Sequence, residues 1–145
     1  MILISHRGNL LGKNEKLENN PDYIIEAEKN GFDVEIDIWF KNGQFYLGHD
    51  KPQYKVNKKF LENSKFWCHA KNKSALYELS IINCHYFWHE TDDYTITSLG
   101  YIWIYPNKPI LKNGICVLPE KFENRDINNK CKGICSDYIL NYKYL

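Results

Sequence analysis

Residues 32–50 decide the fold, and they read FDVEIDIWFKNGQFYLGHD. β-Branched and aromatic residues are dense on both sides of Asn42-Gly43, a dipeptide typical of a two-residue hairpin turn. The stretch therefore predicts two strands, Phe32–Phe40 and Phe45–Gly48, joined by a tight turn. Glu35 and Asp37 are two residues apart in the first of these strands, so their carboxylates project from the same face.

Short apolar runs of the same kind recur along the chain, and each ends in polar residues. They are Ile2–Ser5, Phe66–Ala70, His85–His89, Tyr101–Tyr105, Gly114–Leu118 and Gly133–Cys135. Helices are predicted between some of these runs, at Pro21–Asn30 with Asn20 as its N-cap, at Val56–Asn63, and at Ser74–Ile82 with Ser74 as its cap. Thr95–Gly100 is long enough for one helical turn. Strands that alternate with helices favour a parallel α/β arrangement.

Composition narrows the class of protein. A chain of 145 residues predicts one domain, residues 1–145, with its own core. Its 19 basic and 18 acidic residues give a net charge of +1, and the lysines are scattered, which argues against a nucleic-acid partner. The five cysteines are expected to be reduced structural thiols. We expect a cytoplasmic protein with no integral membrane segment, because we find no signal peptide and no apolar run of about 20 residues.

Polar residues follow the predicted strands at the ends where parallel barrels gather their functional groups. His6 and Arg7 follow the first run, Glu35 and Asp37 lie on the second, and His49 follows the hairpin. Two carboxylates on one buried face are costly without a cation. A hard divalent ion, Mg²⁺ or Ca²⁺, would offset that cost through oxygen ligands.

These residues occur in an ordered set that resembles the glycerophosphodiester phosphodiesterase family. The set comprises His6-Arg7-Gly8, Glu18-Asn19-Asn20-Pro21, the helix end Ala27–Gly31, Glu35-Ile36-Asp37 and His49-Asp50. It covers about the first fifty residues, with Gly133–Tyr138 similar to the family's last barrel strand. The resemblance implies a compact TIM-barrel-like fold with seven or eight mainly parallel strands and with reduced or missing helices in the second half.

The resemblance also implies roles for individual residues. His6 and His49 would be the general acid and base, Glu35 and Asp37 the metal ligands, Arg7 and Lys71 the phosphate-binding cations, and Glu18 a supporting residue. His69 stands where the family supplies a third acidic ligand. Other strand ends offer further candidates, for which roles in the core, in caps or in loops are the alternative: His89, Glu120, Asp137 and Trp103.

Two hypotheses follow. The first is a metal-dependent phosphodiester hydrolase that acts on glycerophosphodiesters or a related small phosphodiester. The second is a catalytically degenerate barrel that binds a phosphate-containing ligand without turnover. His69 and the short chain favour the second hypothesis, whereas the retention of His6, His49 and both carboxylates favours the first. The leaving alcohol and the oligomeric state stay open.

Overall fold

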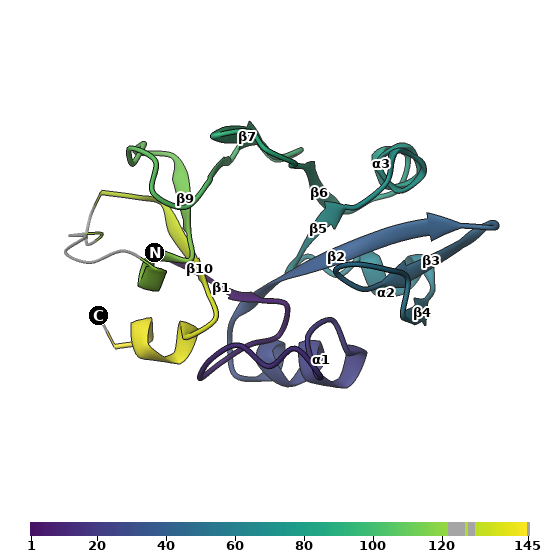
Figure 1. Cartoon of the computed structure of the whole chain (residues 1–145), viewed down its shortest axis with the longest axis horizontal. Helices are drawn as coiled ribbons and strands as arrows, with labels where there is room; N and C mark the ends of the chain where they lie inside the picture. Colours follow the sequence, from purple (N-terminus) through teal and green to yellow (C-terminus); the bar gives the residue numbers. More distant parts are fainter. Residues whose placement is uncertain (122–126, 128–129, 145) are drawn as a thin grey trace.

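The computed structural model describes residues 1–121, 127 and 130–144, and its main feature is one curled sheet (Figure 1). The strands are β1 (Ile2–His6), β2 (Asp33–Lys41), β3 (Gln44–Leu47), β4 (Tyr54–Val56), β5 (Phe66–Ala70), β6 (His85–Trp88), β7 (Tyr94–Ile96), β8 (Ile102–Ile104), β9 (Gly114–Val117) and β10 (Gly133–Ser136). The helices are α1 (Pro21–Lys29), α2 (Lys58–Leu61) and α3 (Lys73–Ser80), with 3₁₀ turns η1 (Pro119–Lys121) and η2 (Ile139–Tyr142).

Strand β2 connects the parts of this sheet. Its first residues pair in parallel with β1, and its last residues pair with β3 across the predicted hairpin. Asn42 and Gly43 both have positive φ, 51° and 73°, as a type I′ turn requires. The other edge of β2 pairs in parallel with β5, which in turn pairs with β6. On the far side, β1 is followed in parallel by β10, β9 and β8.

The prediction of a TIM-barrel-like fold with mainly parallel strands is wrong. The sheet is mixed, with antiparallel pairs β2/β3, β3/β4 and β7/β8, and it curls into a half-barrel. In the described residues, the three short α-helices all lie between β1 and β6. The connections β6–β7 and β7–β8 have five residues each and β8–β9 has nine, whereas a helical crossover needs about a dozen or more.

The predicted helical turn at Thr95–Gly100 is also wrong. Thr95 and Ile96 belong to β7, which turns back antiparallel onto β8. The turn closes with a hydrogen bond from the Gly100 N–H to the Thr97 carbonyl. Gly100 has a φ of 82°, so this turn needs a residue that tolerates the left-handed region.

Asparagine side chains cap the N-termini of the longer helices. The Asn20 side chain accepts a hydrogen bond from the Asp22 N–H, which confirms the predicted cap of α1. The cap of α3 is Asn72 and not Ser74, since Asn72 accepts from the Ala75 N–H. Asn72 also exchanges two hydrogen bonds with the backbone of Phe40, so the same side chain ties α3 to β2.

Alternation along β2 and β5 separates a helix-covered core from the concave side of the sheet. Val34, Ile36 and Ile38 are fully buried in the core cluster that includes residues of α1, α2 and α3. Glu35 and Asp37 occupy the alternate positions and therefore face the concave side. A second cluster fills part of the interior of the curl with Ile4, Trp67, Phe87, Trp103, Ile115 and Cys135.

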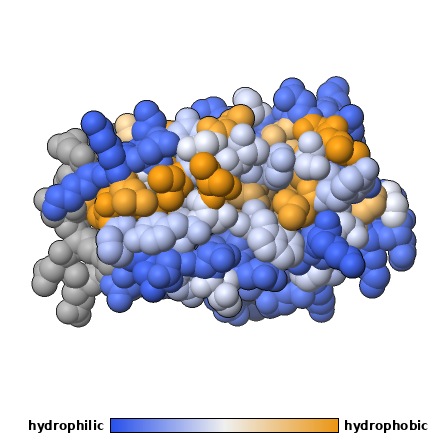
Figure 2. Space-filling model, turned by 90° about the horizontal axis from the view of Figure 1, so that it is seen from above, coloured by the Kyte–Doolittle hydropathy of each residue, from blue (hydrophilic) through white to orange (hydrophobic). Residues whose placement is uncertain are grey.

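The side of the sheet that carries β7 has no covering helix in the described part of the chain. Figure 2 shows a band of apolar residues across this face, and Ile96 and Leu99 are 67% and 66% exposed. Their exposure follows from the short connections, because no segment there is long enough to pack over them. Of the helices in the described residues, none combines the length and apolar character that crossing a membrane requires.

We predict that truncating the centre of β2 destabilises the fold. Ile36→Ala should lower the free energy of unfolding by about 2–5 kcal/mol, because Ile36 is fully buried. Ile96→Ala is the control, with an expected change within about 0.5 kcal/mol because Ile96 is exposed. Urea unfolding measures both. Equal losses for the two variants would contradict this account of the core.

Candidate active site

Three adjacent parallel strands bring the central polar residues together. His6 ends β1 and lies opposite Glu35 of β2 in the strand register. Asp37 lies opposite His69 of β5. These residues are far apart in the sequence, and strand pairing brings them close together in space. Four of the residues selected from the sequence thus form one cluster on the concave side.

Asp37 is fully buried and is the most heavily paired group of the cluster. Its Oδ2 lies 2.8 Å from Arg7 Nε and accepts a 2.8 Å hydrogen bond from Asn19 Nδ2. Its Oδ1 lies 3.2 Å from His69 Nδ1 and 3.6 Å from Lys71 Nζ. Burial alone would raise the pKa of Asp37, but Arg7 and His69 hold it well below its usual range. Asp37 is therefore a carboxylate.

Glu35, Asp37 and His69 form a candidate metal centre. Each can offer one ligand atom, and these atoms lie within 4.8 Å of one another. Glu35 Oε2 and Asp37 Oδ1 are buried and accept no hydrogen bond, although His6 Nε2 lies 3.8 Å from the first and His69 Nδ1 3.2 Å from the second. Two carboxylate oxygens and one imidazole nitrogen are the kinds of donor that a divalent cation binds.

His69 makes this centre different from an all-acidic one. Its Nε2 lies 2.9 Å from the carbonyl oxygen of His89, and Nε2 donates in this bond because a carbonyl only accepts. Its Nδ1 faces Glu35 Oε1 at 3.5 Å. Burial lowers the pKa of His69, but Asp37 and Glu35 outweigh burial and raise it to about 9. Without a metal, His69 is a cation at neutral pH, so a metal would have to displace its proton.

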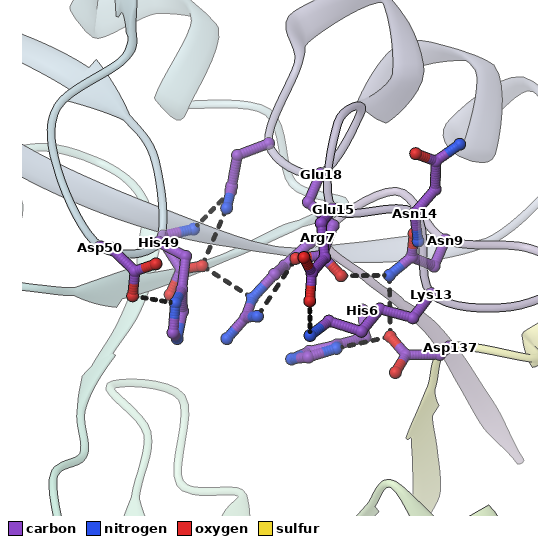
Figure 3. Close-up of polar contacts among 12 residues, drawn as sticks. His6, Arg7, Asn9, Lys13, Asn14, Glu15, Glu18, His49, Asp50 and Asp137 are labelled. Atoms are coloured by element: carbon purple, nitrogen blue, oxygen red, sulfur yellow. Dashed lines mark hydrogen bonds and ion pairs between the residues drawn. The ribbon is translucent and has the colours of Figure 1, made fainter.

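His6 is oriented by a carboxylate. Its Nδ1 lies 2.7 Å from Asp137 Oδ1 (Figure 3). Its Nε2 lies 3.8 Å from Glu35 Oε2. Asn9 Nδ2 donates to Asp137 Oδ1 at 2.8 Å and to Glu18 Oε1 at 2.9 Å. Burial alone would raise the pKa of Asp137, but His6 and Asn9 lower it, so Asp137 accepts the Nδ1–H of His6.

The other predicted supporting residues contribute less directly. Glu120 accepts hydrogen bonds from the Ser136 hydroxyl and from the Asp137 N–H, both at 2.9 Å, and so fixes the end of β10. Glu18 lies 3.4 Å from Arg7 Nη1. Trp103 is 4% exposed and packs on Phe87 with ring centroids 4.6 Å apart, which makes it mainly a core residue.

One cavity of about 560 Å³ adjoins this cluster. Its charged side is lined by His6, Arg7, Glu35, His69, Lys71 and Asp137. Aromatic and apolar residues line it as well, among them Trp88, His89, Trp103, Tyr105 and Leu118. Both predicted phosphate-binding cations, Arg7 and Lys71, therefore face the space in which a ligand would sit.

His49 lies at the rim of the cavity and not in its floor. Its side chain is 42% exposed, and its Nδ1 lies 2.7 Å from Asp50 Oδ1. Figure 3 shows the His49–Asp50 pair on one side of Arg7 and the His6–Asp137 pair on the other. The structure thus brings His49 to the same cavity as His6, since both line it, but it leaves His49 accessible to solvent.

Sequence reasoning missed Asn9 and Asn19. Asn19 makes two hydrogen bonds to Asp37, from its Nδ2 to Oδ2 and from the Asp37 N–H to its Oδ1. Asn19 also has a φ of 62°, a conformation that asparagine tolerates better than most residues. Its place in Glu18-Asn19-Asn20-Pro21 was the available signal. Asn9 carried no such signal, because its partner Asp137 is 128 residues away.

We predict a pH-dependent stability that depends on His69. The pKa of His69 is raised from 6.5 to about 9, so protonated His69 stabilises the fold. This contribution is complete below pH 6.5 and is lost as the pH rises through 9. In the presence of a chelator, the unfolding free energy of the wild type should fall relative to His69→Asn by up to about 3 kcal/mol over that range. Urea titrations at several pH values measure the difference. Parallel pH profiles would refute the ion-pair network.

Comparison of the chain with protein-family models, with curated proteins and with solved structures finds no match.

Proposed function

We propose that the protein is a metal-dependent phosphodiester hydrolase. One observation carries the proposal: two buried carboxylates, each with an oxygen that accepts no hydrogen bond, lie near His6, and this cluster adjoins one cavity with Arg7 and Lys71. A phosphodiester hydrolase needs a site for the anionic phosphate, stabilisation of charge on the phosphoryl oxygens, and a group that transfers protons. The cavity offers residues for all three.

Arg7 and Lys71 would bind the phosphate. A guanidinium can donate two parallel hydrogen bonds to phosphate oxygens, and an ammonium adds a point charge. Both cations are held in place by Asp37, at 2.8 Å and 3.6 Å, so they need little reordering when an anion arrives. Glu35, Asp37 and His69 would hold a divalent cation, Mg²⁺ or Ca²⁺ in the first instance. When bound, the cation supplies charge compensation for the phosphoryl oxygens.

His6 would transfer the proton at the attacking oxygen. Asp137 binds its Nδ1–H, which leaves Nε2 as the basic nitrogen on the side of Glu35. In this proposal, Nε2 removes the proton from the attacking hydroxyl, either of water or of the substrate itself. His49, at the rim of the cavity, protonates the leaving alkoxide. The substrate is a glycerophosphodiester or a related small phosphodiester in the cytoplasm, a reducing compartment with which five free cysteines agree.

A second candidate function is phosphate-ligand binding without turnover. It is favoured by the charge around Asp37, because Arg7, His69 and Lys71 already face this carboxylate. Protonated His69 then occupies part of the space between Asp37 and Glu35 that a metal would need. The same cavity would bind the anion through these cations and through no metal.

We predict that hydrolysis of bis(4-nitrophenyl) phosphate and of glycerophosphocholine depends on a metal and on His6. Chelator-treated protein should gain activity when Mg²⁺, Ca²⁺, Mn²⁺ or Zn²⁺ is added. His6→Ala should lower kcat by about 10²–10⁴, the usual contribution of a general acid or base. Turnover no higher than that of His6→Ala with every metal would reject the hydrolase, and retained phosphate binding would then support the second candidate.

We also predict that Lys71 contributes to phosphate affinity. Lys71→Met should weaken inorganic phosphate binding about tenfold, because one charge-assisted contact is lost. Lys73→Met is the matched control: Lys73 is exposed on α3, outside the residues that line the cavity. Its affinity should stay within about twofold of the wild type. Isothermal titration calorimetry gives both constants, and equal weakening in the two variants would place the phosphate elsewhere.

A further inference from the structure

A row of three rings lines the cavity and begins at the candidate metal centre. The ring centroids of His69 and His89 are 6.2 Å apart, and those of His89 and Tyr105 are 5.4 Å apart. All three residues line the cavity, and we call them the ring row. His69 belongs to the candidate metal centre, but His89 and Tyr105 have no part in the proposed reaction. Their presence in the cavity therefore calls for a separate account.

The ends of β5, β6 and β8 build the ring row. His69 and Phe87 lie opposite each other in the paired strands β5 and β6, and their rings stack 4.9 Å apart with planes inclined by 10°. His89 comes two residues after Phe87, so alternation places both side chains on the same side. Tyr105 directly follows β8, and its N–H donates a 2.9 Å hydrogen bond to the Asp93 carbonyl. Strand pairing and this bond hold the rings in position before a ligand arrives.

The outer end of the ring row is open to solvent. The side chains of His69 and His89 are 11% and 10% exposed, whereas Tyr105 is 45% exposed. The cavity has a volume of about 560 Å³, within the range of about 300–1,000 Å³ that is usual for sites of drug-sized ligands. A phosphate group bound by Arg7 and Lys71 would leave most of this volume unfilled. The ring row therefore offers a surface for a second part of the same ligand.

The charges near the ring row favour a neutral group over a cationic one. Burial and the positive charges of His69 and Lys71 lower the pKa of His89, although Asp92 and Glu35 oppose these charges. His89 is therefore a neutral ring at pH 7. A cationic arm placed beside His89 would meet the same two positive charges, whereas a neutral planar ring would not. Aromatic side chains pack with planar rings in stacked or edge-to-face arrangements.

We infer that the ring row binds a neutral, planar aromatic group on one arm of the phosphodiester. The inference rests on the proposed function, because it assumes that Arg7 and Lys71 hold the phosphate of the same ligand. It narrows the substrate class to diesters in which one alcohol carries an aromatic ring, either an aryl group or a nucleobase. That ring stacks against Tyr105 and His89 while the phosphate stays at Lys71, two residues after His69.

The experiment measures binding, so it does not need turnover. Isothermal titration calorimetry of the full chain in chelator, at about pH 8, compares phenyl phosphate with methyl phosphate. Both esters are dianions there, and they differ only in the arm. Phenyl phosphate should bind at least about fivefold more tightly, because its ring stacks on the ring row. Thymidine 5′-phosphate distinguishes the two sources of the ring: affinity at or above that of phenyl phosphate assigns a nucleobase, and lower affinity assigns an aryl group.

Tyr105 is the residue to change, because it is exposed and its loss should leave the fold intact. Tyr105→Leu should reduce the advantage of phenyl phosphate to within about twofold and leave the affinity for methyl phosphate unchanged. Tyr105→Phe retains the ring and should retain the advantage. Tyr77→Leu is the matched control, since Tyr77 is 64% exposed on α3, outside the residues that line the cavity. Circular dichroism checks that every variant is folded.

Equal affinity for phenyl and methyl phosphate, or a phenyl advantage that survives Tyr105→Leu, would overturn the inference. Tighter binding of phosphocholine than of phenyl phosphate would also overturn it, because the choline arm is a cation. In these cases weaker methyl phosphate binding by Lys71→Met would still support the phosphate site. A phenyl advantage in a chain that hydrolyses no diester would support the ring row and reject the hydrolase. Absence of binding by every ester would overturn both.

Discussion

Burial of two carboxylates on one face of β2 is the constraint on which the site depends. Glu35 and Asp37 are 1% and 0% exposed, and an isolated buried carboxylate would cost several kcal/mol. Three cations from the two neighbouring strands offset that cost: Arg7 after β1, His69 in β5 and Lys71 after β5. The charge of the cavity thus follows from one electrostatic requirement, which the pairing of β1, β2 and β5 meets.

The half-barrel brings the buried carboxylates and their cations together although it has few helices. Parallel pairing of β1, β2, β5 and β10 brings His6 at the end of β1, Asp37 in the middle of β2, His69 near the end of β5 and Asp137 just after β10 into one cluster. Helices α1, α2 and α3 cover only the part of the sheet that carries the acidic pair. The connections from β6 to β9 are too short for helical crossovers, and Ile96 and Leu99 near β7 stay exposed.

His69 accounts for the difference between the two candidate functions. An acidic residue in its place would add a third negative charge and favour a hard cation. A histidine between Glu35 and Asp37 instead binds a proton with a pKa of about 9. Metal and proton therefore compete for the same nitrogen, and the chemistry of the cavity depends on which of them Nδ1 holds.

The sequence by itself determined the local elements and the identity of most site residues. Hydrophobic alternation and Asn42-Gly43 were enough for the β2–β3 hairpin, and Asn20 was enough for the start of α1, because both depend on neighbouring residues. Only the tertiary structure decided that the sheet is an incomplete, mixed half-barrel, that Asp137 orients His6, and that Asn72 ties α3 to Phe40 of β2. These features depend on pairing between residues far apart in the chain, and local sequence patterns carry no information about such distances.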